Sequence, residues 1–306
     1  MSKAKIFAAN AVIMTAAALL MRAVGLAFNV FISNRLGGAG MGLFSLIMSV
    51  YGFASTLAVS GVNLASTRLT AEGLGMRDDN YISSSMKKCV IFSFAFGSAA
   101  CFLLTVLSKP IGLYIIKDAR AVGSLYALAL SLPFVALSSA LGGYFNAKRK
   151  VTRNVSGQIF GQLARIMITA MLFSTAAPEI FKKDPCFSVC LGASVSEGLY
   201  CLYMIALYRF EKNKRCRSED KSITSKLLNI ALPTAFSSYI RSGLLSLEHM
   251  LIPRGLRKSG SSGETAVASY GVLCGMVMPV VLFPMALLSS FAGLLVPELS
   301  EEKARG

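Results

Sequence analysis

The sequence predicts an all-helical protein that crosses a membrane several times. Of its 306 residues, 54% are hydrophobic and only 15% are charged, and the mean hydropathy is +0.61. Soluble domains carry about one-quarter charged residues, so this composition is typical of a polytopic membrane protein. The apolar segments lack the alternation of a membrane β-barrel, and a helix satisfies its own backbone groups in lipid. Eight segments are long and apolar enough to span a bilayer: 6–32, 42–66, 89–108, 122–144, 155–176, 187–208, 227–253 and 267–296.

The first segment resembles a secretory signal, because lysines precede an apolar stretch in "MSKAKIFAANAVIMTAAALL". Its apolar run is longer than a signal's, and no small-x-small cleavage site precedes the end of the run, so we expect a retained first helix. Nineteen of the 31 lysines and arginines then fall on the side of the N-terminus and nine on the other side. The positive-inside rule therefore predicts a multi-pass protein of the cytoplasmic membrane with a cytoplasmic N-terminus.

The sequence offers no motif for a metal site, a cofactor or covalent catalysis. Seven cysteines occur without a CxxC spacing, and His249 is the single histidine, so neither HExxH nor a histidine cluster exists. There is no Walker loop for ATP. A nucleic-acid partner would require a basic face on a soluble domain, and we expect no such domain here. We therefore expect a protein that is not an enzyme.

Two parts of the chain resemble each other, which predicts an internal repeat. An offset of 219 residues aligns three pairs of polar residues: Arg22 with Arg241, Asn29 with Glu248, and Arg35 with Arg254. After a loop that is longer in the second copy, the offset becomes 229 and aligns Gly42 with Gly271. Both copies start on the same side of the membrane. The expected relation is therefore a pseudo-two-fold axis along the membrane normal.

Four stretches carry a resemblance to a known family: "RLGGAGMGLFSLIMSVYGF" (35–53), "GVNLASTRLTAE" (61–72), "LEHMLIPRGL" (247–256) and the long segment 270–301. They resemble the multidrug/oligosaccharidyl-lipid/polysaccharide (MOP) exporter superfamily. Within it, the chain is similar to the polysaccharide flippases of the stage V sporulation protein B branch, which are related to lipid II flippases. The resemblance implies a MATE-like fold of two parallel six-helix lobes.

The same resemblance predicts how the chain is divided. Residues 1–210 are expected to form the first lobe with helices 1–6, residues 211–226 a cytoplasmic linker, and residues 227–306 the start of the second lobe with helices 7–8. Family members usually have twelve or more helices. We therefore expect either a fragment of a longer protein or a truncated product.

Arginines inside the predicted spans are the candidate substrate-binding residues. An arginine in lipid is costly, and such residues usually face a bundle interior or an aqueous cavity. The resemblance implies that helices 1 and 7 line the cleft between lobes, so Arg22 and Arg241 are expected to bind a pyrophosphate there, together with Asn29 and Glu248. Guanidinium keeps its charge and engages phosphate oxygens in a bidentate fork. Snorkelling to an interface or pairing with a carboxylate is the alternative for these arginines.

Arg165 and Glu197 form a second candidate group. Glu197 is the only acid in the predicted span 187–208, and the two side chains are expected to neutralise each other in a structural pair or to take part in ion coupling. Glu248 lies seven residues after Arg241, on nearly the same helix face, and has the same two alternatives.

The sequence favours a transporter over an enzyme. Its expected function is to move a lipid-linked anionic oligosaccharide or peptidoglycan precursor across the cytoplasmic membrane by alternating access, with roles in polysaccharide, cell-wall and sporulation processes. The expected partners are the sugar pyrophosphate, membrane lipids and a coupling ion. One alternative is a MATE-like drug or cation antiporter. Another is a membrane transferase acting on polyprenyl-linked sugars, which should show acidic metal-binding clusters.

Overall fold

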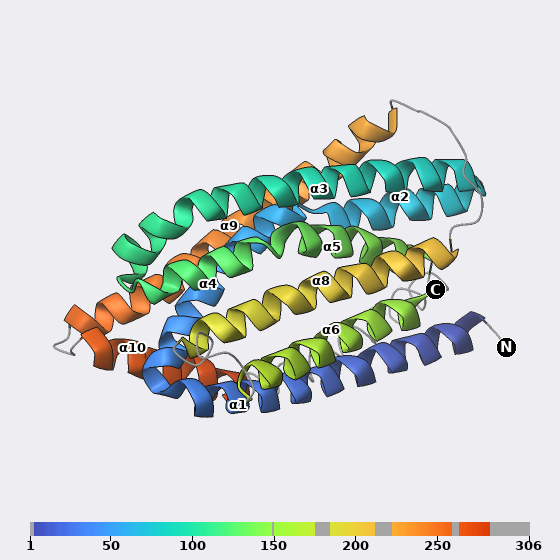
Figure 1. Cartoon of the computed structure of the whole chain (residues 1–306). Helices are drawn as coiled ribbons and strands as arrows, with labels where there is room; N and C mark the ends of the chain where they lie inside the picture. The colour runs from blue at the N-terminus through green and yellow to red at the C-terminus, as the bar shows by residue number, and fades with distance from the viewer. Residues whose placement is uncertain (1–2, 149, 175–183, 212–221, 259–262, 282–306) are drawn as a thin grey trace, which may run out of the picture.

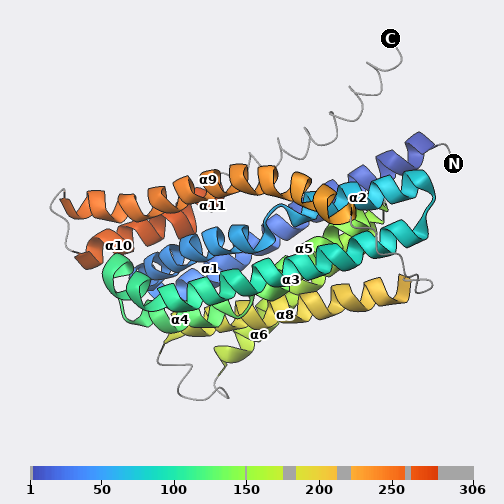
Figure 2. The same ribbon diagram turned by 90° about the horizontal axis from the view of Figure 1, so that it is seen from above.

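The computed structural model describes residues 3–148, 150–174, 184–211, 222–258 and 263–281, and every regular element in them is a helix. The helices lie roughly along one direction between two ends of the molecule (Figures 1 and 2). Their order is α1 (Lys3–Val59), α2 (Val62–Met76), α3 (Asp79–Pro110), the π-helix η1 (Ile111–Ile116), α4 (Arg120–Ala129), α5 (Leu132–Ala147), α6 (Val151–Leu172), α8 (Pro185–Glu211), α9 (Ser222–Lys258), α10 (Gly263–Val272), the π-helix η2 (Leu273–Val277) and α11 (Met278–Val281).

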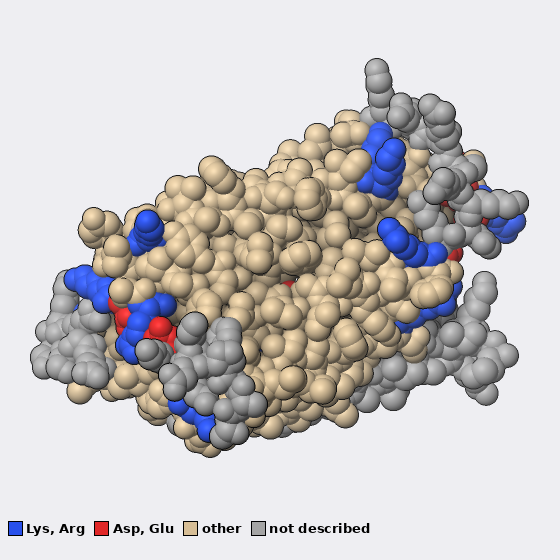
Figure 3. Space-filling view, in the orientation of Figure 1, with Lys and Arg blue, Asp and Glu red and all other residues tan. Residues whose placement is uncertain are grey.

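The two ends of the molecule are set by where the helices begin and turn. The N-terminal end holds the start of α1, the turn from α2 to α3 and the end of α8, whereas the far end holds the connection from η1 to α4, the end of α9 and the start of α10 (Figure 1). On the face drawn in Figure 3, charged side chains gather toward these ends, and the surface between them is almost entirely uncharged. Large apolar side chains such as Phe94, Phe102 and Met167 are exposed on the described surface. This distribution suits a lipid environment.

The helix α1 consists of two helical halves joined at one glycine. Gly37 has φ 67° and ψ 177°, which breaks the helical geometry inside Lys3–Val59. Glycine is favoured here because a positive φ carries no Cβ penalty for it. The chain therefore reverses at the far end, between the predicted spans 6–32 and 42–66.

Five described helical segments are long and apolar enough to span a membrane: Leu19–Met76, Asp79–Ile116, Arg120–Ala147, Thr152–Leu172 and Pro185–Glu211. The helical fold class is thus confirmed, but the expected number of eight spans is not. The predicted span 227–253 lies in α9, which is interrupted by polar residues and two prolines and is not among the five. Of the predicted span 267–296, only the shorter apolar helix Thr265–Gly275 qualifies, and residues beyond 281 lie outside the described ranges.

Small residues hold the bundle of α1 to α8 together. A Cβ atom on Gly157 would lie 2.8 Å from the Sδ atom of Met204, and one on Gly161 would lie 3.2 Å from the Cβ atom of Tyr200. The helices α6 and α8 therefore approach closely along the "GQIFG" stretch. This approach fixes the two helices that carry Arg165 and Glu197.

A second glycine contact joins α1 to α10. A methyl group on Gly42 would overlap the carbonyl oxygen of Val267, and one on Gly271 would overlap the carbonyl oxygen of Gly38. The repeat register aligns residue 42 with 271, and the same offset continued back by one helical turn pairs residue 38 with 267. Exchanging the two copies of the repeat therefore exchanges these two contacts, which is the property of a self-complementary contact about a two-fold axis.

Polar side chains attach α9 to α1 and α2. The hydroxyl of Ser246 donates to the carbonyl oxygen of Ser49 at 3.0 Å, and the hydroxyl of Thr56 donates to Ser242 at 3.1 Å. At the N-terminal end, Lys226 forms an ion pair with Glu72. The face of α9 that carries Ser242 and Ser246 is therefore packed against the bundle.

Candidate functional site

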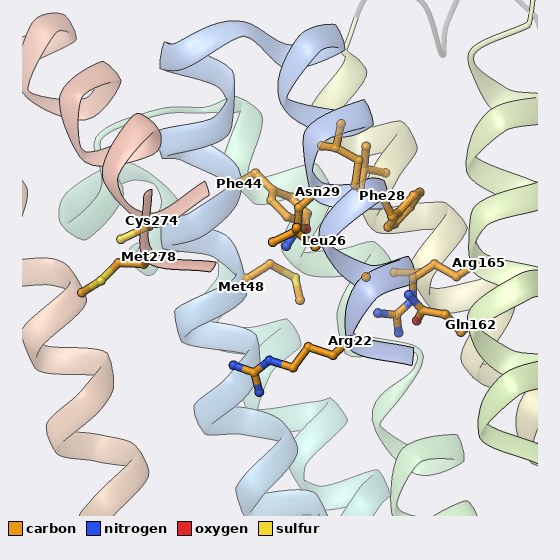
Figure 4. Close-up of a pocket in the computed structure, with 14 residues that line it drawn as sticks. Arg22, Leu26, Phe28, Asn29, Phe44, Met48, Gln162, Arg165, Cys274 and Met278 are labelled. Carbon is orange, nitrogen blue, oxygen red and sulfur yellow. The ribbon is translucent and has the colours of Figure 1, made fainter. Parts of the chain in front are cut away.

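A cavity of about 510 Å³ lies where both halves of α1 meet α6, α8 and the segment from η2 to α11. Figure 4 shows the residues that surround it. We call it the Arg22 cavity. Its polar lining residues are Arg22, Asn29, Gln162 and Arg165, and its other lining residues are Gly25, Leu26, Phe28, Ile32, Phe44, Met48, Val189, Ala193, Cys274 and Met278.

The first half of α1 supplies Arg22 and Asn29 to this cavity. Residues seven positions apart lie on nearly the same face of a helix, so both side chains reach the same space. In Figure 4 the Arg22 side chain extends away from Gln162 and Arg165, so the cations come from different sides of the cavity. Gly25 lies between Arg22 and Asn29 along α1, and a Cβ atom on Gly25 would lie 3.8 Å from the Nε2 atom of Gln162.

Arg165 lines the cavity while forming an ion pair. Its Nη2 atom donates to the Oε1 atom of Glu197 at 2.6 Å, and the two side chains are 29% and 21% exposed. The Nε atom of Arg165 is buried and has no hydrogen-bond acceptor among the described residues. Glu197 therefore neutralises this arginine, whose buried Nε–H makes no hydrogen bond to the described residues.

The charge of the cavity lining is positive. Its lining residues within the described ranges include two arginines and no carboxylate. Apolar side chains such as Phe28, Ile32 and Val189 are buried beside them, so little protein polarity screens the arginines. Because Glu197 offsets one guanidinium from outside the lining, the arrangement suits an anionic group better than a cationic one.

The structure separates Arg241 and Glu248 from Arg22 and Asn29. Neither residue of α9 lines the Arg22 cavity, and both are exposed. A helix turns by roughly 100° per residue, which places Arg241 and Glu248 on a face of α9 turned away from Ser242 and Ser246. The cavity thus brings together three of the six sequence candidates: Arg22, Asn29 and Arg165.

Gln162 is a polar lining residue that is not among the six candidates predicted from the sequence. It precedes Arg165 by three positions, and residues three apart share a helix face. The position of Arg165 in an apolar span could therefore have indicated that Gln162, on the same helix face, also lines the cavity. The described residues contain no group of three or more His, Cys, Asp or Glu side chains that could hold a metal ion.

Comparisons with known proteins agree with this architecture. The family model described as "Polysaccharide biosynthesis protein" matches residues 7–302. Stage V sporulation protein B of Bacillus subtilis (strain 168) is 24% identical, over 96% of this chain and 58% of its own length. Sporulation protein YkvU of the same organism is 21% identical, over 97% of this chain and 66% of its own length. The chain therefore spans about 58% to 66% of these relatives.

Solved transporters of the MOP superfamily share the fold. An inward-facing multidrug resistance MATE family transporter has a TM-score of 0.66 and 15% identity, and the match covers 88% of this chain and 60% of that one. A MOP superfamily transporter from Pyrococcus furiosus, described as having a binding pocket of reverse polarity, has a TM-score of 0.69 and 13% identity, with 93% and 63% covered. At these identities the matches show the fold, which is that of MATE-like transporters.

Proposed function

The chain belongs to the polysaccharide biosynthesis protein family, and from this membership and the Arg22 cavity we propose that it binds a lipid-linked, anionic sugar intermediate and forms part of its flippase. The observation that carries the proposal is the pair of arginines in a lining without a carboxylate among the described residues. A pyrophosphate bears several negative charges and accepts the fork of hydrogen bonds that guanidinium offers. The cargo class that fits is a polyprenyl pyrophosphate sugar, such as a peptidoglycan precursor.

The arrangement of charges supports different roles for Arg22 and Arg165 in binding the anion. Arg22 is exposed to the cavity from α1, whereas Arg165 is oriented by Glu197. A buried cation is stabilised by such a partner, and it can still meet an anion through its remaining donors. In this proposal Arg22 and Arg165 hold the pyrophosphate from opposite sides, and Asn29 and Gln162 donate to the first sugar.

The proposal also divides the chain into parts. Residues 1–210 form a first lobe, residues 211–226 run from the last residue of α8 into the first turns of α9, and residues 227–306 begin a second lobe. The reciprocal contacts of Gly42 with Val267 and of Gly271 with Gly38 support this division, because they match a repeat with parallel copies. Alternating access would move one lobe against the other around the cavity. The lysines and arginines at the N-terminal end of the molecule support the proposal that this end lies on the cytoplasmic side of the membrane.

Ligand binding to the purified chain tests this proposal. We would titrate the chain in a non-ionic detergent with a farnesyl pyrophosphate-linked sugar and, separately, with a large organic cation. The expected result is saturable binding of the anionic ligand, weakened roughly tenfold or more by Arg22→Gln through the loss of a charged hydrogen bond. Arg68→Gln is the matched control, because this exposed arginine of α2 lies outside the cavity lining.

Two outcomes would contradict the proposal. One is binding of the organic cation without binding of the anionic ligand, which would favour a cation antiporter. The other is an affinity for the anionic ligand that Arg22→Gln and Arg68→Gln change to the same extent, which would make Arg22 a residue of packing or topology.

A further inference from the structure

A second cavity lies at the far end of the molecule, between η1 and the end of α9. Its volume is about 240 Å³, and it shares no lining residue with the Arg22 cavity. We call it the Lys117 cavity. It is lined by Leu46, Ile115, Ile116, Lys117, Met250, Pro253 and Arg254.

The two charged residues of this lining are both cations, and they come from distant parts of the chain. Lys117 follows η1, and Arg254 is on α9. Both residues are exposed, and no ion pair involves either of them among the described residues. Two like charges that line one small space repel each other, and an anion bound between them offsets that repulsion.

The backbone holds Lys117 in an unusual conformation. Its φ is 63°, a left-handed value that is uncommon for a residue with a side chain, and its N–H donates to the carbonyl oxygen of Gly112 at the end of the π-helix. π-helical turns occur frequently at functional sites. Here the π-helix ends at Ile116, and the residue that caps it, Lys117, lines the cavity.

The nearest acid along the chain is engaged elsewhere. Asp118 accepts from the Nη2 atom of Arg120 at 2.8 Å and from its Nε atom at 3.1 Å, and it does not line the cavity. The hydrogen bond from Arg120 lowers the pKa of Asp118, so this carboxylate is charged and directed to Arg120 at neutral pH. Asp118 therefore does not neutralise Lys117 or Arg254, and an anion from another source can bind to them.

The other end of α9 meets the bundle with opposite charges. Lys226 donates to Glu72, and the hydroxyl of Tyr81 donates to the same carboxylate at 3.0 Å. On the same part of α9, Ile223, Leu227 and Ala231 are buried in one apolar cluster with residues of α2. The N-terminal end of α9 thus has its own counter-charge within the chain, and the far end presents two cations to one cavity.

We infer that the Lys117 cavity is a second anion site, which binds a phosphate or pyrophosphate group between Lys117 and Arg254. Arg254 supplies a planar fork for two oxygens, and Lys117 supplies a point charge. The bound anion joins η1 to α9 and so stabilises the far end, as the Glu72–Lys226 pair does at the N-terminal end. This site goes beyond the proposed transport of a lipid-linked sugar, because its cations belong to a separate cavity. Either a soluble phosphate compound or a phospholipid headgroup supplies this chemistry.

Binding measurements with matched variants test this site. The full chain carrying Arg22→Gln, which weakens anion binding in the first cavity, is placed in nanodiscs of phosphatidylcholine alone and titrated with inorganic pyrophosphate. A second arm uses nanodiscs that contain phosphatidylglycerol, and lipid retained on the chain is counted by native mass spectrometry. In one of these arms we expect anion binding that Lys117→Gln and Arg254→Gln each weaken by roughly tenfold. Lys109→Gln is the control, since this lysine near the end of α3 is exposed and outside the cavity lining.

Hydrogen exchange adds a readout for the joining of η1 to α9. The bound anion should slow exchange of the amides in 111–118 and 250–256, and Arg254→Gln should abolish this slowing. Binding only in the first arm identifies a soluble phosphate compound, and binding only in the second identifies a lipid headgroup. The inference is overturned if neither arm shows an anion, or if the Lys117 and Arg254 variants bind as Lys109→Gln does.

Discussion

The two cavities differ in whether the cations that line them form ion pairs with acids of the chain. In the Arg22 cavity, Arg165 is already paired with an acid of the chain, because Glu197 accepts from it at 2.6 Å. In the Lys117 cavity, neither lining cation forms an ion pair with the described residues. The first cavity therefore has a charge arrangement that is partly balanced without a ligand, whereas the second depends on an anion from outside the described chain.

The cavities also differ in what holds them together. The Arg22 cavity is lined by α1, α6 and α8 of one closely packed bundle, with Cys274 and Met278 added from the segment that follows α10. The Lys117 cavity is bounded by η1 on one side and the end of α9 on the other. Changes in bundle packing should therefore affect the first cavity most, and changes in charge should affect the second.

The largest expected effect is on the ion pair of the Arg22 cavity. Glu197→Leu leaves the mostly buried guanidinium of Arg165 without its carboxylate, and breaking such a pair costs about 3 kcal/mol of folding stability. Thermal unfolding in detergent, followed by circular dichroism, measures the loss. The double variant Arg165→Leu/Glu197→Leu should recover most of the stability, because no charge is then left unpaired. A double variant that is less stable than Glu197→Leu would contradict this account of the pair.

The next effect separates bundle packing from charge. Gly42→Ala places a methyl group against the carbonyl oxygen of Val267 and should cost about 1–3 kcal/mol through overpacking at the crossing of α1 and α10. Gly52→Ala is its matched control on the same helix, because a Cβ atom there meets nothing within 4 Å. Alanine favours helices over glycine by about 1 kcal/mol, so the control should be neutral or stabilising. Equal melting temperatures for the two variants would refute the close crossing.

The smallest effect concerns the acid next to the Lys117 cavity. The pKa of Asp118 is lowered by its hydrogen bond with Arg120, so the stability that this pair contributes is present above the ordinary pKa of aspartate, about 3.9, and is lost as the pH falls through the lower folded value. The Arg120 side chain is 62% exposed, so Asp118→Asn should cost well under about 1 kcal/mol at neutral pH. Melting temperatures of wild type and Asp118→Asn should converge in strong acid. A difference that grows as the pH falls would contradict the assigned pair.

How much could be predicted from the sequence differs between these regions. Apolar runs alone were sufficient for the helical class and for the reversal between the first two predicted spans. The spacing of Glu197 and Arg165 could not show contact by itself, but the shortage of other acids in the segment favoured their pairing. These predictions depend on local composition and on the high cost of isolated charges in lipid.

The surroundings of a residue depend on other helices, and there the repeat was a poor guide. Arg22 and Arg241 occupy equivalent positions in the two copies, yet α6 and α8 stand beside Arg22 and give it a cavity. Arg241 is exposed on the face of α9 turned away from α1. Similarly, the Lys117 cavity combines residues from two distant parts of the chain, and no motif in either part marks it. Sequence similarity locates a position along a helix, whereas the neighbouring helices determine its chemistry.

The most direct test of the central claim is whether Arg22 and Arg165 bind the same pyrophosphate. We would measure the affinity for a farnesyl pyrophosphate-linked sugar in wild type, Arg22→Gln, Arg165→Gln/Glu197→Gln and the triple variant, with Arg241→Gln as the control. Removing Glu197 together with Arg165 avoids an unpaired carboxylate. Two residues that contact one ligand should show a coupling energy of about 1 kcal/mol or more, whereas Arg241→Gln should stay within about twofold of wild type. Losses that add independently, or an Arg241→Gln variant that loses binding while Arg22→Gln retains it, would contradict a shared site in the Arg22 cavity.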